Sequence, residues 1–330
     1  MADVTITSFA ELFSFANGDY GRGTSSEQIS VELATDLDFS EIEETSPYAE
    51  FRENWGGCTG TWYIDFNGGK HSISNISFFG SGSWAFFANL GAGSKVSNLY
   101  LPNISINSSS TATSIGITST ATAVTIYNCR VTGNITGRTA YGIASLGSIN
   151  ALVKNCYFIG NLYATASSNP TVSGLTQSPV VNSFFHGTIG ANLSAITNGL
   201  ALITQSTAMN SFFSGAINIE NAVPNTIQCA GTSRFCYAAV TNIADIFASG
   251  WRNSTSSPWG SSSVSCIYST ILDDDPESHT YNQPKPWNDG EIQQYTAEED
   301  GVTVVKYLTS PYAEIDLHNQ NVFTKRGFAM

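Results

Sequence analysis

An asparagine that returns about every 27 residues, with a glycine five residues after it, is the feature that most constrains how this chain folds. The pattern is clearest in Ile126–Ile135 and Val153–Leu162, where short apolar runs flank the two residues. The asparagines are Asn98, Asn128, Asn155, Asn182 and Asn210, and the glycines of the last four copies are Gly133, Gly160, Gly187 and Gly215. The steps between these asparagines are 30, 27, 27 and 28 residues. Self-similarity at such a period indicates structural units that stack on one another.

A second repeated element, in which Ile or Leu follows a glycine, lies between these copies. Its members are Ile115–Ile117, Tyr141–Ile143, Ser173–Leu175 and Asn198–Leu200. Each repeat therefore offers two or three short strands separated by Gly and Asn turns. The period is too short for a propeller blade of about 40 residues. We predict an all-β chain that forms a right-handed parallel β-helix (solenoid), whose coils pair in register as parallel sheets.

The repeated residues have mechanical roles in such a fold. Asparagine tolerates the left-handed conformation at a tight bend, and stacked asparagines form an amide ladder. Glycine supplies positive φ at the other corner of the coil. Equivalent side chains are expected to stack on successive coils: Cys129 on Cys156, Phe184 on Phe212, and Phe185 on Phe213.

Acidic residues divide the chain into three parts. Residues 1–65 hold 13 of them, residues 220–330 hold the other 13, and none lies between Asp65 and Glu220. The segment between them carries five basic residues: Lys70, Lys95, Arg130, Arg138 and Lys154. We predict an N-terminal cap over 1–55, a β-helix over 56–250, and a C-terminal tail or assembly module over 251–330.

Composition excludes several classes of partner. The net charge of −13 disfavours nucleic acid and anionic membranes, because phosphates are bound by Lys and Arg. No apolar run is long enough to cross a bilayer. Residues 1–5 lack the basic and apolar regions of a signal peptide, so we do not expect export by the ordinary secretory route. The six cysteines contain no C-x-x-C pair and are expected to be free thiols in the core, without zinc.

The two ends differ from the repeats. Ser8–Glu11 fits a capping box, and the helix that follows ends at Asn17–Gly18. Its apolar face is expected to shield the first coil and contains Phe9, Leu12, Phe13 and Ala16. A docking helix for a partner is the alternative. After Trp251 the repeat is lost, and we expect an irregular tail with one strand at Val302–Leu308 that packs on the solenoid or on other subunits.

An ordered series of motifs resembles the GLUG-type repeats of bacterial and phage surface proteins. Ile6–Gly18 resembles the family's leading helix and Val31–Phe39 its "aDIDL" strand. Phe66–Ile76 resembles its "DGNGHTISNL" segment, and the Asn-Cys copies resemble its "NCyatG" segments. The Gly-Leu-x-Gly element itself has lost its second glycine here. The resemblance covers about two thirds of the chain. It implies a β-helix with surface or virion placement, and it implies no reaction.

Residues that could carry chemistry are few. Asp36 and Asp38 could bind calcium, but acids on the solvent face of a strand are the favoured interpretation, since no Gly-rich ligand loop follows. His186 is expected to be an exposed side chain and His71 a structural one. Glycoside hydrolysis needs two carboxylates about 5 to 10 Å apart, and the coils from 66 to 219 contain no Asp or Glu. We therefore predict no catalytic residue, no metal and no cofactor.

The expected function is a non-catalytic structural or adhesive virion protein of a bacteriophage: a tail fibre, spike or other appendage. We expect a homo-oligomer, with a trimer favoured, that contacts other virion proteins and a host surface glycan. Candidate glycan contacts are Tyr100, Tyr157, Phe184 and Phe212, for which stacked core residues are the stronger interpretation. A bacterial cell-surface adhesin is the first alternative. A polysaccharide-degrading β-helix enzyme with a site between subunits is the second.

Overall fold

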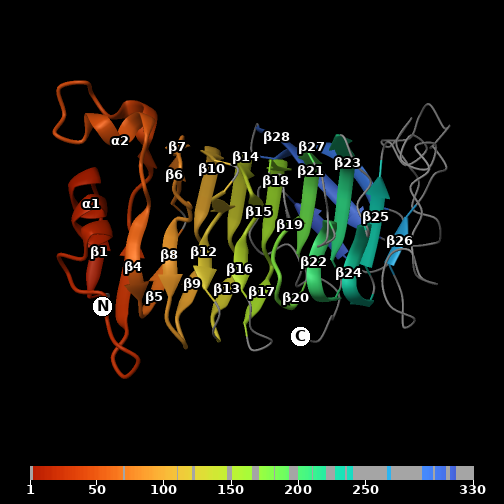
Figure 1. The fold of residues 1–330 in the computed structure, drawn as a ribbon, viewed down its shortest axis with the longest axis horizontal. Helices are drawn as coiled ribbons and strands as arrows, with labels where there is room; N and C mark the ends of the chain where they lie inside the picture. Colours follow the sequence, from red (N-terminus) through yellow and green to blue (C-terminus); the bar gives the residue numbers. More distant parts are fainter. Residues whose placement is uncertain are drawn as a thin grey trace.

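Parallel pairing between successive repeats organises the chain into a β-solenoid of about seven turns (Figure 1). The computed structural model describes residues 3–69, 71–109, 111–120, 123–146, 151–165, 171–181, 183–192, 200–209 and 211–220. Beyond these it describes only the backbone of 227–234, 236–240, 266–268, 292–299, 302–309 and 313–316. The predicted asparagines Asn182 and Asn210 lie outside the described residues.

Three parallel sheets run along the solenoid. The first sheet contains β1 (Val4–Ile6), β2 (Ile29–Leu33), β5 (Ile64–Asn67), β9 (Lys95–Ser97), β13 (Thr125–Tyr127), β17 (Leu152–Lys154), β20 (Val180–Val181), β22 (Leu200–Met209), β24 (Ile227–Arg234), β19 (Thr171–Ser173), β15 (Thr139–Tyr141) and β11 (Thr113–Ile115). The second sheet contains β7 (Ser77–Gly80), β10 (Tyr100–Ser108), β14 (Arg130–Gly137), β18 (Tyr157–Ala164), β21 (Phe184–Asn192), β23 (Phe212–Glu220), β25 (Cys236–Val240) and β26 (Cys266–Tyr268). The third sheet contains β4 (Cys58–Trp62), β8 (Phe87–Leu90), β12 (Thr118–Thr120) and β16 (Ala144–Leu146), and a short pair joins β3 (Leu37–Asp38) to β6 (Ile73–Ser74).

The second sheet confirms the alignment of the repeats. In β14, β18, β21 and β23 the four repeat glycines lie opposite one another. Two residues further on, the apolar position of each repeat also pairs with its equivalents, and these side chains lie in the core: Ile135, Leu162, Ile189 and Ile217. Side chains of one kind therefore form columns parallel to the long axis.

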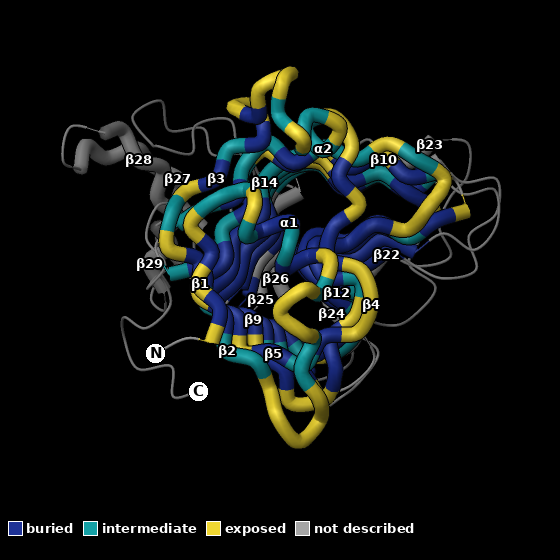
Figure 2. The backbone as a smooth tube through the Cα atoms, turned by 90° about the vertical axis from the view of Figure 1, so that its left-hand side faces the viewer, coloured by how far each residue is buried: buried dark blue, intermediate teal, exposed yellow. Residues whose placement is uncertain are grey.

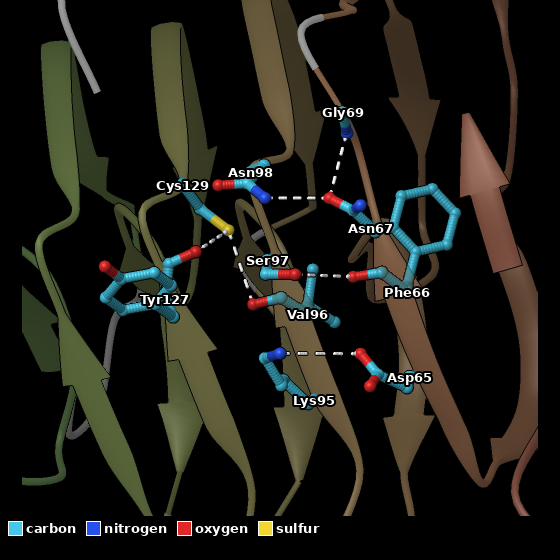
Figure 3. A network of polar contacts seen from close by, with 10 residues as sticks. All are labelled: Asp65, Phe66, Asn67, Gly69, Lys95, Val96, Ser97, Asn98, Tyr127 and Cys129. Carbon is cyan, nitrogen blue, oxygen red and sulfur yellow. Dashed lines mark hydrogen bonds and ion pairs between the residues drawn. The ribbon is translucent and has the colours of Figure 1, made fainter. Parts of the chain in front are cut away.

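The repeat asparagines adopt the predicted left-handed conformation, with φ near 55° at Asn98, Asn128 and Asn155. Their amides form the predicted ladder. Asn128 Nδ2 donates to Asn98 Oδ1 at 2.7 Å. Asn98 Nδ2 in turn donates to Asn67 Oδ1 at 2.8 Å, as Figure 3 shows. Asn98 and Asn128 thus each turn the chain and also join their coil to the preceding one.

The repeat glycines have positive φ as predicted, but their place in the coil differs from the prediction. Gly133 and Gly160 lie inside β14 and β18 and not at a corner, with φ of 129° and 142°. A Cβ atom on Gly160 would overlap the carbonyl oxygen of Gly133 on the preceding coil. Glycine is required here because one backbone passes directly against the next.

The second repeated element is confirmed in three copies, and Asn198 and Gly199 of the fourth lie outside the described residues. Gly116, Gly142 and Gly174 follow one another on successive coils. The next residue in this column is Leu202 and not Gly199, because Val172 pairs with Leu200. Leucine occupies the glycine position there, so the spacing of glycines alone could not give the register.

The cysteines at the position after the repeat asparagine are buried, as predicted, and they also make hydrogen bonds. The N–H of Cys129 donates to Sγ of Cys156 at 3.4 Å, and the N–H of Cys156 donates to Oγ of Ser183 at 3.0 Å. The N–H of Ser183 continues the series to Oγ of Ser211 at 3.2 Å. Burial raises the pKa of the Cys129 thiol, which keeps it protonated. Among the described residues, the third free thiol is the buried Cys58.

The N-terminal helix α1 (Phe9–Asn17) lies over the end of the solenoid. Ser8 caps it through a hydrogen bond from the N–H of Glu11, and Gly18 ends it with φ of 87°. The Glu11 carboxylate accepts from the N–H of Thr7 and not from that of Ser8, so the capping box is shifted by one residue. Figure 2, seen from the N-terminal end of the solenoid, draws α1 in front of the stacked strands.

Phe15 is the helical residue that the sequence analysis missed. It is fully buried, and its ring centroid lies 4.6 Å from that of Trp62 in the first coil. Arg22 holds the helix end from outside, because it donates to the carbonyls of Asn17 and Thr59 and lies over the Trp62 ring. These contacts fix the helix against β4.

A second, unpredicted helix protects an edge of the second sheet. After the 3-10 turn η1 (Phe39–Glu41), α2 (Ala49–Glu53) brings Asn54 and Trp55 beside the edge strand β7. The N–H of Trp55 donates to the carbonyl of Ser77 at 2.9 Å, and Asn54 Oδ1 accepts from the N–H of Phe79 at 3.1 Å. Covered edges of this kind resist pairing with other chains.

In the C-terminal tail, the predicted strand is one of three. β27 (Ile292–Glu299), β28 (Val302–Thr309) and β29 (Ala313–Asp316) form an antiparallel sheet. This sheet differs in kind from the parallel coils, in keeping with the loss of the repeat after Trp251.

Gly160→Ala tests the glycine column. We expect it to lower the free energy of unfolding by about 3 kcal/mol, because the methyl group meets backbone and the φ is unfavourable for alanine. Gly56→Ala is the control, since nothing lies within 4 Å of its Cβ position, and its effect should stay within about 0.5 kcal/mol. Chemical denaturation followed by circular dichroism measures both. Equal effects of the two substitutions would contradict the close approach.

Candidate functional site

Asp36 and Asp38, for which calcium binding was the less favoured interpretation, hold the first two coils together. Asp36 Oδ1 accepts from the N–H of Ser72 at 2.7 Å and from its hydroxyl at 3.1 Å. His71 Nδ1 lies 3.7 Å from the same oxygen, which is an ion-pair distance but too long for a hydrogen bond. Within the described part of the chain, no three His, Cys, Asp or Glu residues gather as metal ligands.

Asp38 ends a second amide ladder. Asn103 Nδ2 donates to Asn75 Oδ1, and Asn75 Nδ2 donates to Asp38 Oδ1 at 2.6 Å. The same carboxylate oxygen also accepts from the N–H and hydroxyl of Ser40. Burial by itself raises the pKa of Asp38, but these hydrogen bonds together outweigh it and leave the pKa below its usual value.

His186 lies on β21 between equivalent positions of its neighbours, opposite Ile159 and Ser214. It is half-buried, whereas the sequence analysis expected an exposed side chain. The structure does not bring it near the other predicted residues: His71, Asp36 and Asp38 belong to the first coils, before β7.

An open cleft of about 400 Å³ lies beside the N-terminal strands. It is lined by Asp3, Val4, Tyr20, Gly23, Thr24, Glu27, Gln28 and Ile29. The Asp3 carboxylate accepts from the N–H of Ser30 at 2.9 Å, which fixes its position. Tyr20 is 45% exposed and is one of two large apolar side chains that the described residues expose. An aromatic ring beside carboxylates and an amide suits the apolar faces and hydroxyl groups of a sugar.

Sequence reasoning missed this cleft because its residues come from three separate stretches of the first 30 residues. The signal present was the concentration of acids in that part of the chain. Those acids are equally typical of an N-terminal cap. The sequence separation of Asp3 and Glu27 does not indicate that β1 and the Thr24–Glu27 turn line the same cleft.

On the outward face of the first sheet, two lysines contact side chains of the preceding coil. Lys95 Nζ lies 3.8 Å from Asp65 Oδ1 on the preceding coil (Figure 3). Lys154 Nζ lies 5.7 Å from the centre of the Tyr127 ring. Two of the five basic residues of the acid-free segment thus meet partners on this face.

The side chains named as candidate glycan contacts do not form an exposed surface together. Tyr157 and Phe184 are almost completely buried, and their rings stack at 4.9 Å. Both belong to the buried hydrophobic residues, as the stronger interpretation expected, although they lie outside the main core cluster. Burial raises the pKa of Tyr100, although the nearby charge of Arg130 opposes this. The backbone of Phe212 follows in register, and its side chain lies outside the described residues.

The sequence matches no known family model and no curated protein. Neither helix in the described part of the chain is long and apolar enough to span a membrane.

Asp38→Asn tests the carboxylate end of the amide ladder. Folding lowers the pKa of Asp38, so its ionised carboxylate stabilises the folded state. This contribution is complete above the pKa of Asp in the unfolded chain, about 3.9, and is lost as the pH falls through the lower pKa of the folded state. The melting temperature of the variant should therefore lie below that of the parent near neutral pH and approach it toward about pH 2. The exposed Asp19→Asn is the control and should track the parent throughout. If the melting temperatures of Asp38→Asn and the parent differed by the same amount at every pH, this role of the carboxylate would be contradicted.

Proposed function

We propose that this chain is a non-catalytic structural and adhesive component of a bacteriophage virion appendage, such as a tail fibre or spike. The observation that carries the proposal is the in-register stacking of equivalent side chains along the solenoid. Asparagine amides, serine hydroxyls and cysteine thiols join one coil to the next. Such ladders make a stiff shaft, because its polar side chains form hydrogen bonds between neighbouring coils.

The composition of the shaft supports the same proposal. Residues 66–219 contain no Asp or Glu, and charged residues make up 12% of the whole chain. Hydrolysis of a glycan needs paired carboxylates, which these coils do not supply. The resemblance of the repeats to GLUG-type surface proteins adds the virion or cell surface as the place of action. We propose a homotrimer that contacts other virion proteins and a host glycan.

A bacterial cell-surface adhesin is the alternative with the same physical basis. The N-terminal cleft favours a further candidate, a polysaccharide-degrading enzyme with a site between subunits. Asp3 and Glu27 supply two carboxylates outside the acid-free segment, and Tyr20 offers a ring for a sugar face. The candidates differ in where the protein is found and in whether glycan chains are cut.

Mass spectrometry of purified phage particles tests the virion proposal. We expect peptides from this chain in intact virions, in whole-number ratio to the other appendage proteins. Its presence only in bacterial envelope fractions would overturn the proposal in favour of the adhesin. Incubating the purified chain with host capsule tests the enzyme candidate, since release of oligosaccharides would overturn the non-catalytic assignment.

Tyr20→Ala tests adhesion through the cleft. We expect host-cell binding to weaken about tenfold, because the ring is the large apolar surface that the cleft presents to a sugar. Phe79→Ala is the matched control, since Phe79 is 72% exposed on β7 and does not line the cleft. Binding of labelled protein to host cells measures both variants. Equal affinities for parent and Tyr20→Ala would show that the cleft is not the contact.

A further inference from the structure

A column of aromatic rings on the second sheet is interrupted by one arginine. Tyr100, Arg130, Tyr157 and Phe184 occupy the same position on four successive coils. The Arg130 guanidinium carbon lies 5.4 Å from the Tyr100 ring centre and 5.8 Å from that of Tyr157. Phe184 stacks on Tyr157 from the other side. These four residues form the aromatic–arginine column.

This column faces away from the core of the solenoid. Successive side chains of a strand point to opposite faces. The next residues along the strands, Val131, Phe158 and Phe185, belong to the main core cluster inside the coils, so the column points to the opposite face of the sheet. A stripe on the outward face of a sheet would ordinarily be in contact with solvent.

Tyr100 is half-buried, and the other three members are buried, increasingly so along the chain. The exposed fraction is 9% for Arg130, 3% for Tyr157 and zero for Phe184. A stacked ring covers only the faces of its neighbours and leaves their outer edges open. Another segment must therefore lie over these side chains.

The charge of Arg130 indicates the chemistry of that segment. Among the residues that the structure describes, its Nε atom has no hydrogen-bond partner, and residues 66–219 contain no carboxylate that could neutralise the guanidinium. A buried cation is strongly unfavourable unless an anion pairs with it. The covering segment is therefore expected to be acidic.

We propose that the antiparallel sheet β27–β29 of the same chain packs over the aromatic–arginine column and supplies a carboxylate to Arg130. Residues 220–330 hold half of the acids of the chain. Four of them lie within the sheet itself: Glu298, Glu299, Glu314 and Asp316. Figure 1 draws β27 and β28 behind the stretch from β14 to β23, the same part of the shaft. A three-stranded sheet also needs an apolar surface to be stable, and the column provides one.

Photo-cross-linking of the full chain tests the placement. Tyr157 is replaced by p-benzoylphenylalanine, and Tyr127, on the outward face of the first sheet, is replaced in the control. We expect irradiation to join position 157 to a peptide within 292–316 of the same molecule, and position 127 to give no such product. Cross-links from position 157 to other segments, or to 292–316 of a second molecule in a covalent dimer, would overturn the proposal. Circular dichroism confirms that each variant keeps its β-structure.

Charge removal tests the carboxylate independently of the probe. In one variant the four acids of β27–β29 become amides through Glu298→Gln, Glu299→Gln, Glu314→Gln and Asp316→Asn. The control carries Asp273→Asn, Asp274→Asn and Asp275→Asn, which lie in the same tail but outside the sheet. We expect nitration of Tyr157 by tetranitromethane to rise at least several-fold in the first variant only. Equal nitration of the two variants would overturn the proposed pairing.

Discussion

Parallel backbone pairing between neighbouring coils is the constraint on which the rest of this structure depends. Since each coil aligns residue for residue with the next, any side chain that recurs at the repeat period meets its own kind. Asparagine then finds an amide partner and glycine lets two backbones pass. The identity of a residue in one coil is thus set mainly by its counterparts above and below.

This constraint explains why much of the fold could be predicted from the sequence. The spacing of Asn98, Asn128 and Asn155 gave the stacking, and the structure shows the left-handed bends and the amide bonds that the spacing implied. The glycine column gave the register of four strands but not their boundaries. A glycine with positive φ is as typical of a turn as of a close backbone approach, and only neighbouring coils distinguish the two. Where Leu202 takes the place of glycine, the sequence signal for the register is lost.

The candidate sites were less predictable, for a physical reason. A column such as Tyr157 and Phe184 has the same sequence whether it lines the core or the outer face, because the repeat fixes stacking and not direction. The cleft at Asp3 and Glu27 lies outside the repeats, so no periodicity points to it. Predicted acids such as Asp38 turned out to end a ladder that begins with asparagine, a role visible only once the coils are aligned.

The nearest-neighbour character of the ladders has a consequence for length. A middle coil contacts the one before it and the one after it, so its removal lets two equivalent surfaces meet. Duplicating or deleting one unit of 27 residues, such as the step from Asn128 to Asn155, would change the shaft by a single strand spacing of about 4.8 Å. The length of such a shaft can therefore change in small, equal steps, while the N-terminal cap and the C-terminal tail stay unchanged.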